Sequence, residues 1–386
     1  MGTRGGRCTV DQESPPWPLS FHRQVVTDAR LSTHGRASEP HQHLVHPARV
    51  VLTAVVVADE ERAAVDETCC RGPWHEPEAM HWLDSLYLSL TRRQPLFEQG
   101  WGDLDRPLAE VPRFLTRSHE APLALDFVPI GQRVEDASVT SPAPHLRDET
   151  RRLHVRRLRA RGPLRARVVV PPSWGDEGFG LRTRLMDGLR SAGVEVWLFE
   201  GAYFGSRRAA GQRGVGLHTV GDFLRMGLAN VVEARALVAT AQHLEPQVPV
   251  ALAGYSMAGQ MSAHAAASLD VELPVTVMAP PDNAAVVFCD GPLAASVRWG
   301  RLGDDGHERL RAVLARLSVR SQPVPRSAQR VVVVTKRDGI VPPTSMQDIA
   351  QHWGVAPTHV DSGHLGAYAL HGGALRRAVL QSLGLR

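Results

Sequence analysis

The sequence predicts an α/β fold with a mostly parallel central sheet, helices on both faces and a small helical cap. From residue 164 onward, short valine-rich runs alternate with longer segments whose apolar residues recur at helical spacing. Before them, three short runs at 124–130, 133–141 and 150–158 are separated by Gly and Pro, which indicates antiparallel strands. Ligands bind at the carboxyl ends of strands in such sheets. The functional residues are therefore expected where the predicted strands end.

The elements of the main domain, expected over residues 76–386, follow from this periodicity in chain order. Apolar residues at helical spacing predict two opening helices, one from Met80 to Leu90 and one from Leu104 to Leu115. After the three antiparallel strands, further strands are predicted at 164–171, 194–200, 248–253, 274–281, 330–338 and 358–364. A long helix is predicted from Thr219 to Leu244, because Thr219 and Asp222 form a T-x-x-D capping pattern ahead of an apolar face.

Residues 290–325 break the strand and helix alternation with a mixed helical insertion. We interpret this insertion as the cap, a lid over the substrate site. A single helix is predicted to end the chain after the strand at 358–364.

The segment from Val248 to Gly259 carries the strongest chemical signal. An apolar run leads into Gly254-Tyr-Ser-Met-Ala258 and then into an alanine-rich segment, which predicts a strand, a sharp turn and a helix. A serine on so tight a turn has a strained backbone, so the residues two before and two after it must be small, as Gly254 and Ala258 are. Ser256 is therefore predicted as a nucleophile presented at the apex of the turn.

Two downstream residues complete a candidate catalytic triad. Enzymes with this kind of nucleophile turn carry their triad in the chain order Ser, acid, His. Asp338 follows the valine-rich run that begins at Arg330, and His364 follows the short strand that begins at Thr358. Each would be an ordinary turn or surface residue if considered alone. Because the order Ser256, Asp338, His364 is the required one, we predict these three as nucleophile, acid and base.

The same reasoning predicts an oxyanion hole. The backbone N–H of Met257, at the start of the helix after Ser256, points toward the place where an oxyanion would form. A second N–H is expected from the loop after the strand at 164–171, at Trp174 or its neighbour Ser173. Alternatively, Trp174 covers the core.

Several motifs together resemble a known family. Ser173-Trp-Gly-Asp, Tyr203-Phe-Gly-Ser-Arg207, the Gly254–Gly259 turn, Asp338-x-x-Val-Pro and Gly363-His-Leu-Gly-Ala-Tyr368 are similar to motifs of the α/β-hydrolase domain-containing protein 18 family. The resemblance covers about residues 80 to 386. It implies an α/β-hydrolase fold, places Ser256, Asp338 and His364 on the family's nucleophile, acid and base positions, and implies a hydrolase of ester-like bonds, with acyl lipids as one substrate class. Ser173 and Ala258 stand where the family tends to have Gly.

Composition narrows the function classes. The net charge is only +4 and aromatic residues make up 5% of the chain, with no basic motif interleaved with aromatics, so nucleic acid is not an expected partner. An arginine-rich run at 151–161 leaves peripheral membrane contact open, although it also describes a strand with a solvated face. The oligomeric state is not predicted.

Neither metal nor organic cofactor is expected. The four cysteines show no metal or redox spacing, and the histidines at 41, 43 and 46 have no cysteine or carboxylate spaced to complete a metal site. No signal-peptide pattern opens the chain, so a reduced, cytoplasmic location is expected. Residues 1–75, rich in Pro, Gly, His, Arg and Ser, are predicted to be a poorly ordered N-terminal extension.

These observations predict a serine hydrolase that cleaves an ester-type bond of a small-molecule or lipid substrate through an acyl-enzyme on Ser256. Two alternatives remain at this stage. The same triad could act as an acyltransferase, thioesterase or peptidase, because the acceptor is chosen by the shape of cap and pocket. The chain could also be a non-catalytic hydrolase-fold binding protein.

Overall fold

A computed structural model describes residues 81–91, 94–327 and 329–385. The N-terminal extension predicted at 1–75 lies outside the described residues, as do the three histidines at 41, 43 and 46 and every cysteine except Cys289.

The described residues form a nine-stranded sheet in the order β1-β2-β3-β5-β4-β6-β7-β8-β9. The pairs β1–β2, β2–β3 and β3–β5 are antiparallel and the other pairs are parallel, as the sequence predicted. The strands are β1 Val128–Gly131, β2 Val134–Thr140, β3 Arg152–Leu158, β4 Ala166–Val170, β5 Val194–Phe199, β6 Val250–Tyr255, β7 Val275–Met278, β8 Arg330–Thr335 and β9 Thr358–Val360. Every residue of β4, β5, β6 and β7 is buried, which is why these strands are near-continuous apolar runs.

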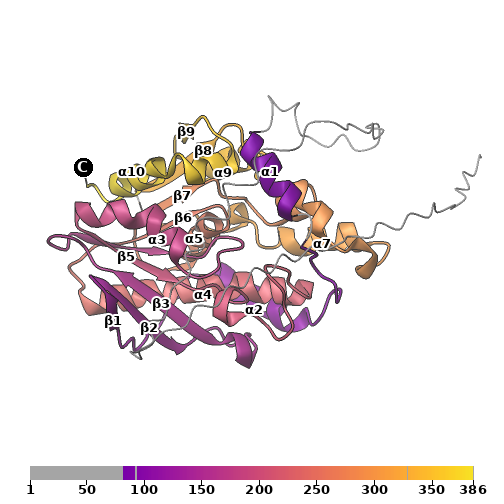
Figure 1. The fold of residues 1–386 in the computed structure, drawn as a ribbon, viewed down its shortest axis with the longest axis horizontal. Coiled ribbons are helices and arrows are strands. Elements are labelled where there is room, and N and C mark those ends of the chain that lie inside the picture. Colours follow the sequence, from indigo (N-terminus) through magenta and orange to yellow (C-terminus); the bar gives the residue numbers. More distant parts are fainter. Residues whose placement is uncertain (1–80, 92–93, 328, 386) are drawn as a thin grey trace, which may run out of the picture. The chain divides into compact units, whose positions relative to one another are not determined.

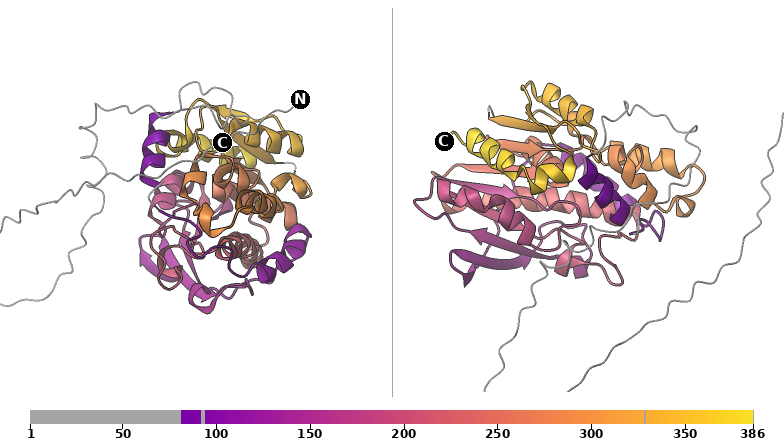
Figure 2. Two further views of the ribbon diagram at one scale, coloured as in Figure 1. Left: turned by 90° about the vertical axis from the view of Figure 1, so that its right-hand side faces the viewer. Right: turned by 45° about the horizontal axis from the view of Figure 1, so that its top comes forward.

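Helices cover both faces of the sheet (Figures 1 and 2). Helix α10 packs against α3 and against β7 and β8, whereas α4 packs against α5 and α2 and against β4 and β6. The helices are α1 Trp82–Thr91, α2 Asp105–Leu115, α3 Gly180–Met186, α4 Val220–Leu244, α5 Met257–Ser268, α6 Ala285–Phe288, α7 Gly306–Ala315, α8 Pro343–Trp353, α9 His364–Ala369 and α10 Gly372–Ser382. The sequence prediction of a mostly parallel sheet between helical layers is confirmed.

The long helix α4 begins as predicted but is more deeply buried than expected. The Asp222 N–H donates to the Thr219 Oγ1 at 3.0 Å, which caps the helix. The sequence indicated an apolar face, and in the structure most residues of α4 are buried, because α2, α5 and the sheet surround it. Among the buried polar residues of α4, Glu233 forms a fully buried ion pair with Arg207.

Two boundaries near the end of the chain differ from the prediction. Strand β9 stops at Val360, so His364 does not end a strand but is the first residue of α9. Two helices, α9 and α10, stand where a single terminal helix was predicted.

The cap segment, residues 290–325, is helical as expected. It consists of α7 and the short 3-10 turns Pro292–Ser296, Trp299–Arg301 and Val319–Ser321. None of the helices in the described ranges has the length and apolar character required for a transmembrane span.

Candidate active site

The turn that presents Ser256 has the strained geometry that the sequence predicted. Ser256 lies between β6 and α5 with φ 56° and ψ −127°, a conformation that L-residues rarely adopt. A Cβ added to Gly254 would lie 2.2 Å from the backbone carbon and oxygen of Ala258, so only glycine fits there. The Ser256 N–H donates to the Met278 carbonyl at 2.8 Å, which fixes the turn to the neighbouring strand β7.

The structure brings Ser256, Asp338 and His364 into one hydrogen-bonded row. The His364 Nε2 lies 3.0 Å from the Ser256 Oγ, and the His364 Nδ1 lies 2.7 Å from the Asp338 Oδ2. Because a carboxylate only accepts hydrogen bonds, Nδ1 carries the proton and the lone pair of Nε2 faces the hydroxyl. The imidazole is thus oriented to accept the Ser256 proton.

The Asp338 carboxylate is held by two further sets of donors. Its Oδ1 accepts the backbone N–H of Ile340 at 2.9 Å and that of Val341 at 2.8 Å. Its Oδ2 accepts the Thr335 hydroxyl at 2.6 Å in addition to His364. These donors fix which oxygen faces the imidazole, and the buried carboxylate is not free to rotate.

Tyr255 contacts both the backbone and the ring of His364. Its hydroxyl donates a hydrogen bond to the backbone carbonyl of His364, and the two rings lie 4.9 Å apart between centroids. Burial raises the pKa of Tyr255 well above its usual value, so the hydroxyl stays protonated as a donor. In the sequence Tyr255 is recognisable only as part of the turn, and no local pattern indicates its contact with His364.

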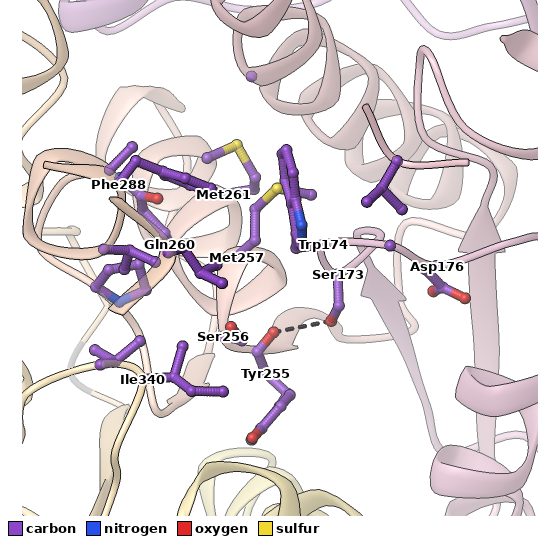
Figure 3. Close-up of a pocket in the computed structure, with 18 of the residues that line it drawn as sticks. Ser173, Trp174, Asp176, Tyr255, Ser256, Met257, Gln260, Met261, Phe288 and Ile340 are labelled. Carbon is purple, nitrogen blue, oxygen red and sulfur yellow. Dashed lines mark hydrogen bonds between the residues drawn. The ribbon is translucent and has the colours of Figure 1, made fainter. Parts of the chain in front are cut away.

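The predicted oxyanion donors both lie at the pocket beside Ser256. The Ser173 hydroxyl donates to the Tyr255 carbonyl at 3.0 Å, which anchors the loop after β4 next to the turn (Figure 3). Within the described part of the chain, the backbone N–H groups of Met257 and Trp174 have no protein acceptor. The Trp174 side chain also packs against aromatic rings, 5.0 Å from Phe288 between centroids, so this residue lines the pocket wall as well.

A largely apolar cavity of about 380 Å³ opens beside Ser256. Met257, Gln260, Met261 and His264, which recur at three- and four-residue spacing, contribute one face of α5 to its wall. Figure 3 shows Met257 and Met261 close to Phe288 and Trp174, above Ser256. The apolar residues that line the cavity include Phe114, Trp174, Leu181, Val215, Phe223, Met226, Met257, Met261, Pro281, Ala284, Val287, Phe288, Leu293, Leu314, Leu317, Ile340, Val341 and Leu365.

The cap segment contributes part of this wall. Leu293, Leu314 and Leu317 lie in it and line the cavity. The segment therefore forms part of the wall of the cavity beside Ser256, whereas its role as a lid stays a prediction. Among the described residues, no cluster of three or more His, Cys, Asp or Glu side chains is arranged to hold a metal ion.

Comparisons with known proteins agree with this architecture. Residues 94–311 and 303–385 match the model of the family described as alpha/beta hydrolase domain containing 18. An acetyl xylan esterase from Paenibacillus sp. R4 is 15% identical, with 76% of this chain and 98% of that chain covered at a TM-score of 0.51. Acetyl xylan esterase 1 from Thermoanaerobacterium sp. JW/SL YS485 is 16% identical, with the same coverages and a TM-score of 0.49. An α/β serine hydrolase from Xanthomonas campestris is 20% identical, covering 66% of this chain and 97% of that chain at 0.41.

These comparisons confirm the predicted α/β-hydrolase fold. At such low identity, the likeness to solved structures shows the fold alone, and activity has to be argued from the site.

Proposed function

The chain belongs to the family described as alpha/beta hydrolase domain containing 18, and from this premise we propose that it is a serine hydrolase that cleaves carboxylic esters through an acyl-enzyme on Ser256. One observation carries the proposal: the Nε2 of His364 lies 3.0 Å from the Ser256 Oγ while its Nδ1 is held by Asp338. A strained, buried turn that aligns a hydroxyl, an imidazole and a carboxylate has few structural uses other than nucleophilic catalysis.

The first half-reaction acylates Ser256. As the Ser256 Oγ attacks the ester carbonyl carbon, its proton passes to the Nε2 of His364, and Asp338 stabilises the imidazolium that forms. The carbonyl oxygen becomes an oxyanion, for which the backbone N–H groups of Met257 and Trp174 are the proposed donors. When the carbon–oxygen bond to the leaving group breaks, the imidazolium returns its proton to the departing alcohol.

The second half-reaction releases the acid. Water gives a proton to His364 and attacks the acyl carbon, and the tetrahedral intermediate then collapses to free the Ser256 Oγ, which recovers the proton. Apart from the substrate and water, the groups used in both halves belong to the protein.

The lining of the cavity favours an apolar acyl group. Methionine, phenylalanine and leucine side chains surround the space beside Ser256, and an acyl chain would bury its methylene groups there at about 0.8 kcal/mol each. We therefore propose esters with an aliphatic acyl chain, including acyl lipids, as the substrate class. Transfer of the acyl group to an acceptor other than water would use the same geometry.

The test combines a covalent probe with an ester series. We expect a fluorophosphonate to label the wild-type protein and p-nitrophenyl esters of graded chain length to be hydrolysed, with both activities lost in Ser256→Ala. Ser262→Ala is the matched control, because Ser262 lies on α5, the helix that follows Ser256, is fully buried, and has a hydroxyl with no hydrogen-bond partner among the described residues. A folded wild-type protein that neither reacts with the probe nor hydrolyses any ester contradicts the proposal. Faster product formation when amines or alcohols are added would identify acyl transfer.

A further inference from the structure

Helix α1, which precedes the part of the chain matched by the family model, reaches into the active site through Asp84. Asp84 lies in the first turn of α1 and is fully buried. A buried carboxylate must be paired or fully hydrogen-bonded, because removing its charge from water is otherwise very costly. Its partners therefore indicate its role.

The Asp84 carboxylate accepts three hydrogen bonds from backbone N–H groups of the two loops that carry the base and the acid. Its Oδ2 accepts from the N–H of His364 at 2.7 Å and from the N–H of Gly339, the residue after Asp338, at 3.0 Å. Its Oδ1 accepts from the N–H of Leu365 at 2.8 Å. The Asp84 side chain thus links the backbone of His364, the proposed base, to the backbone beside Asp338, the proposed acid. Asp84 precedes His364 by 280 residues in the sequence.

The His364 backbone is consequently held on both sides. Asp84 binds its N–H and Tyr255 binds its carbonyl, whereas Asp338 and Ser256 contact only the ring. The start of α9 has no side-chain cap from its own segment, so Asp84 supplies the acceptor that its first N–H groups need. The position of the imidazole relative to Ser256 therefore depends on α1.

Gly363 permits this close approach. A Cβ at Gly363 would lie 2.4 Å from the Cβ of His81 and 2.7 Å from the Asp84 Oδ2, although its φ of −76° and ψ of 179° suit any residue. Glycine at this position is required by the packing of α1 and not by the backbone conformation. Figure 1 shows α1 beside α9, in agreement with the contacts between the two helices.

We propose that Asp84 is a positioning residue of the active site, which fixes His364 and the Asp338 loop in the arrangement that activates Ser256. The proposal rests on the proposed hydrolase function for its kinetic test, and a spectroscopic readout makes it independent of that function. It also predicts that α1 is part of the catalytic unit.

The principal variant is Asp84→Asn, which keeps the shape of the side chain but turns one acceptor oxygen into a donor that faces a backbone N–H. Displacement of a reacting group by about 1 Å costs on the order of 100-fold in rate, so we expect kcat to fall by about that factor with KM unchanged. Asp361→Asn is the matched control. It removes the same charge three residues from His364, but its exposed carboxylate pairs, among the described residues, with Arg337 and with no group of the proposed active site.

Proton NMR provides the readout that does not need turnover. The Nδ1–H of an imidazole bound to a carboxylate resonates far downfield, so this signal is expected in the wild type and in Asp361→Asn, and it is expected to shift or broaden in Asp84→Asn. If the wild type neither reacts with the fluorophosphonate nor hydrolyses esters, the proposed function fails and the NMR comparison alone decides the role of Asp84.

Gly363→Ala is a second way to displace His364, and it leaves the Asp84 carboxylate in place. We expect the same loss in kcat and the same change in the downfield signal, because the added methyl group forces α1 away from α9. If Asp84→Asn does not fold, Gly363→Ala decides the question. The proposal is overturned if either Asp84→Asn or Gly363→Ala folds and has the same kcat and the same downfield signal as Asp361→Asn.

Discussion

Replacement of Asp338 by Asn tests the proposed mechanism most directly, because the structure dictates how the new amide must lie. The Oδ1 position accepts two backbone N–H groups, from Ile340 and Val341, which cannot become acceptors. The amide oxygen of Asn is therefore retained at that position. The amide NH₂ then occupies the Oδ2 position and points at the Nδ1 of His364.

An NH₂ group in this place stabilises the opposite imidazole tautomer. Nδ1 becomes the acceptor and Nε2 carries the proton, so Nε2 no longer accepts the proton of Ser256, 3.0 Å away. A change of tautomer of this kind in a serine triad lowers kcat by about 10⁴-fold, which corresponds to about 5.5 kcal/mol in the activation barrier. The packing around residue 338 is unchanged, so the variant should remain folded.

The assay is the steady-state hydrolysis of a p-nitrophenyl ester, with urea unfolding as the check on folding. Thr335→Val gives an intermediate reference, because it removes one hydrogen bond to the Asp338 Oδ2 but leaves the tautomer unchanged. We expect it to cost about 1 kcal/mol, or less than about tenfold in rate. A folded Asp338→Asn protein that retains a kcat within about tenfold of wild type would refute the assignment of Asp338 as the acid.

Three further predictions concern stability. Gly254→Ala should destabilise the fold by about 3 kcal/mol or more in thermal unfolding, since its methyl group would lie 2.2 Å from the backbone of Ala258; an unchanged Tm would contradict the described turn. Arg207→Met leaves Glu233 buried without its ion-pair partner and should cost about 3–5 kcal/mol in urea unfolding at pH 7. Burial lowers the pKa of His264 from 6.5 to about 4. As the pH falls, His264 is therefore protonated in the unfolded chain at a higher pH than in the folded protein, which lowers the free energy of unfolding. Wild type should therefore lose about 3 kcal/mol more stability between pH 7 and pH 4 than His264→Gln, and equal pH slopes would exclude this contribution.

Local sequence signals were sufficient for most of the sheet and for the Ser256 turn. The valine-rich runs predicted β4, β6 and β8 because buried parallel strands need continuous apolar sequence, and Gly254 and Ala258 marked a turn that excludes larger side chains. The Ser, acid, His order allowed Ser256, Asp338 and His364 to be selected together, and the structure places their side chains in contact. Their catalytic roles stay a proposal.

The contacts that connect distant segments could not be predicted from local sequence patterns. His364 was assigned to the end of a strand because nothing in residues 358–364 shows that α9 starts there, with its first N–H groups bound by Asp84. Tyr255 had no local signal for its bond to the His364 carbonyl. The burial of α4 on most of its sides was not predicted for a similar reason, since the number of neighbours around a helix is not encoded in its own periodicity.

The sequence by itself determined the strand and helix order, the strained turn at Ser256 and the three residues of the candidate triad, because each depends on residues that are neighbours along the chain. Only the tertiary structure decided how those residues are held. The Asp84 carboxylate reaches the backbone of Gly339, His364 and Leu365 from a helix more than 250 residues earlier. Hydrogen bonds over that separation depend on how the whole chain packs, and a local sequence pattern carries no record of them.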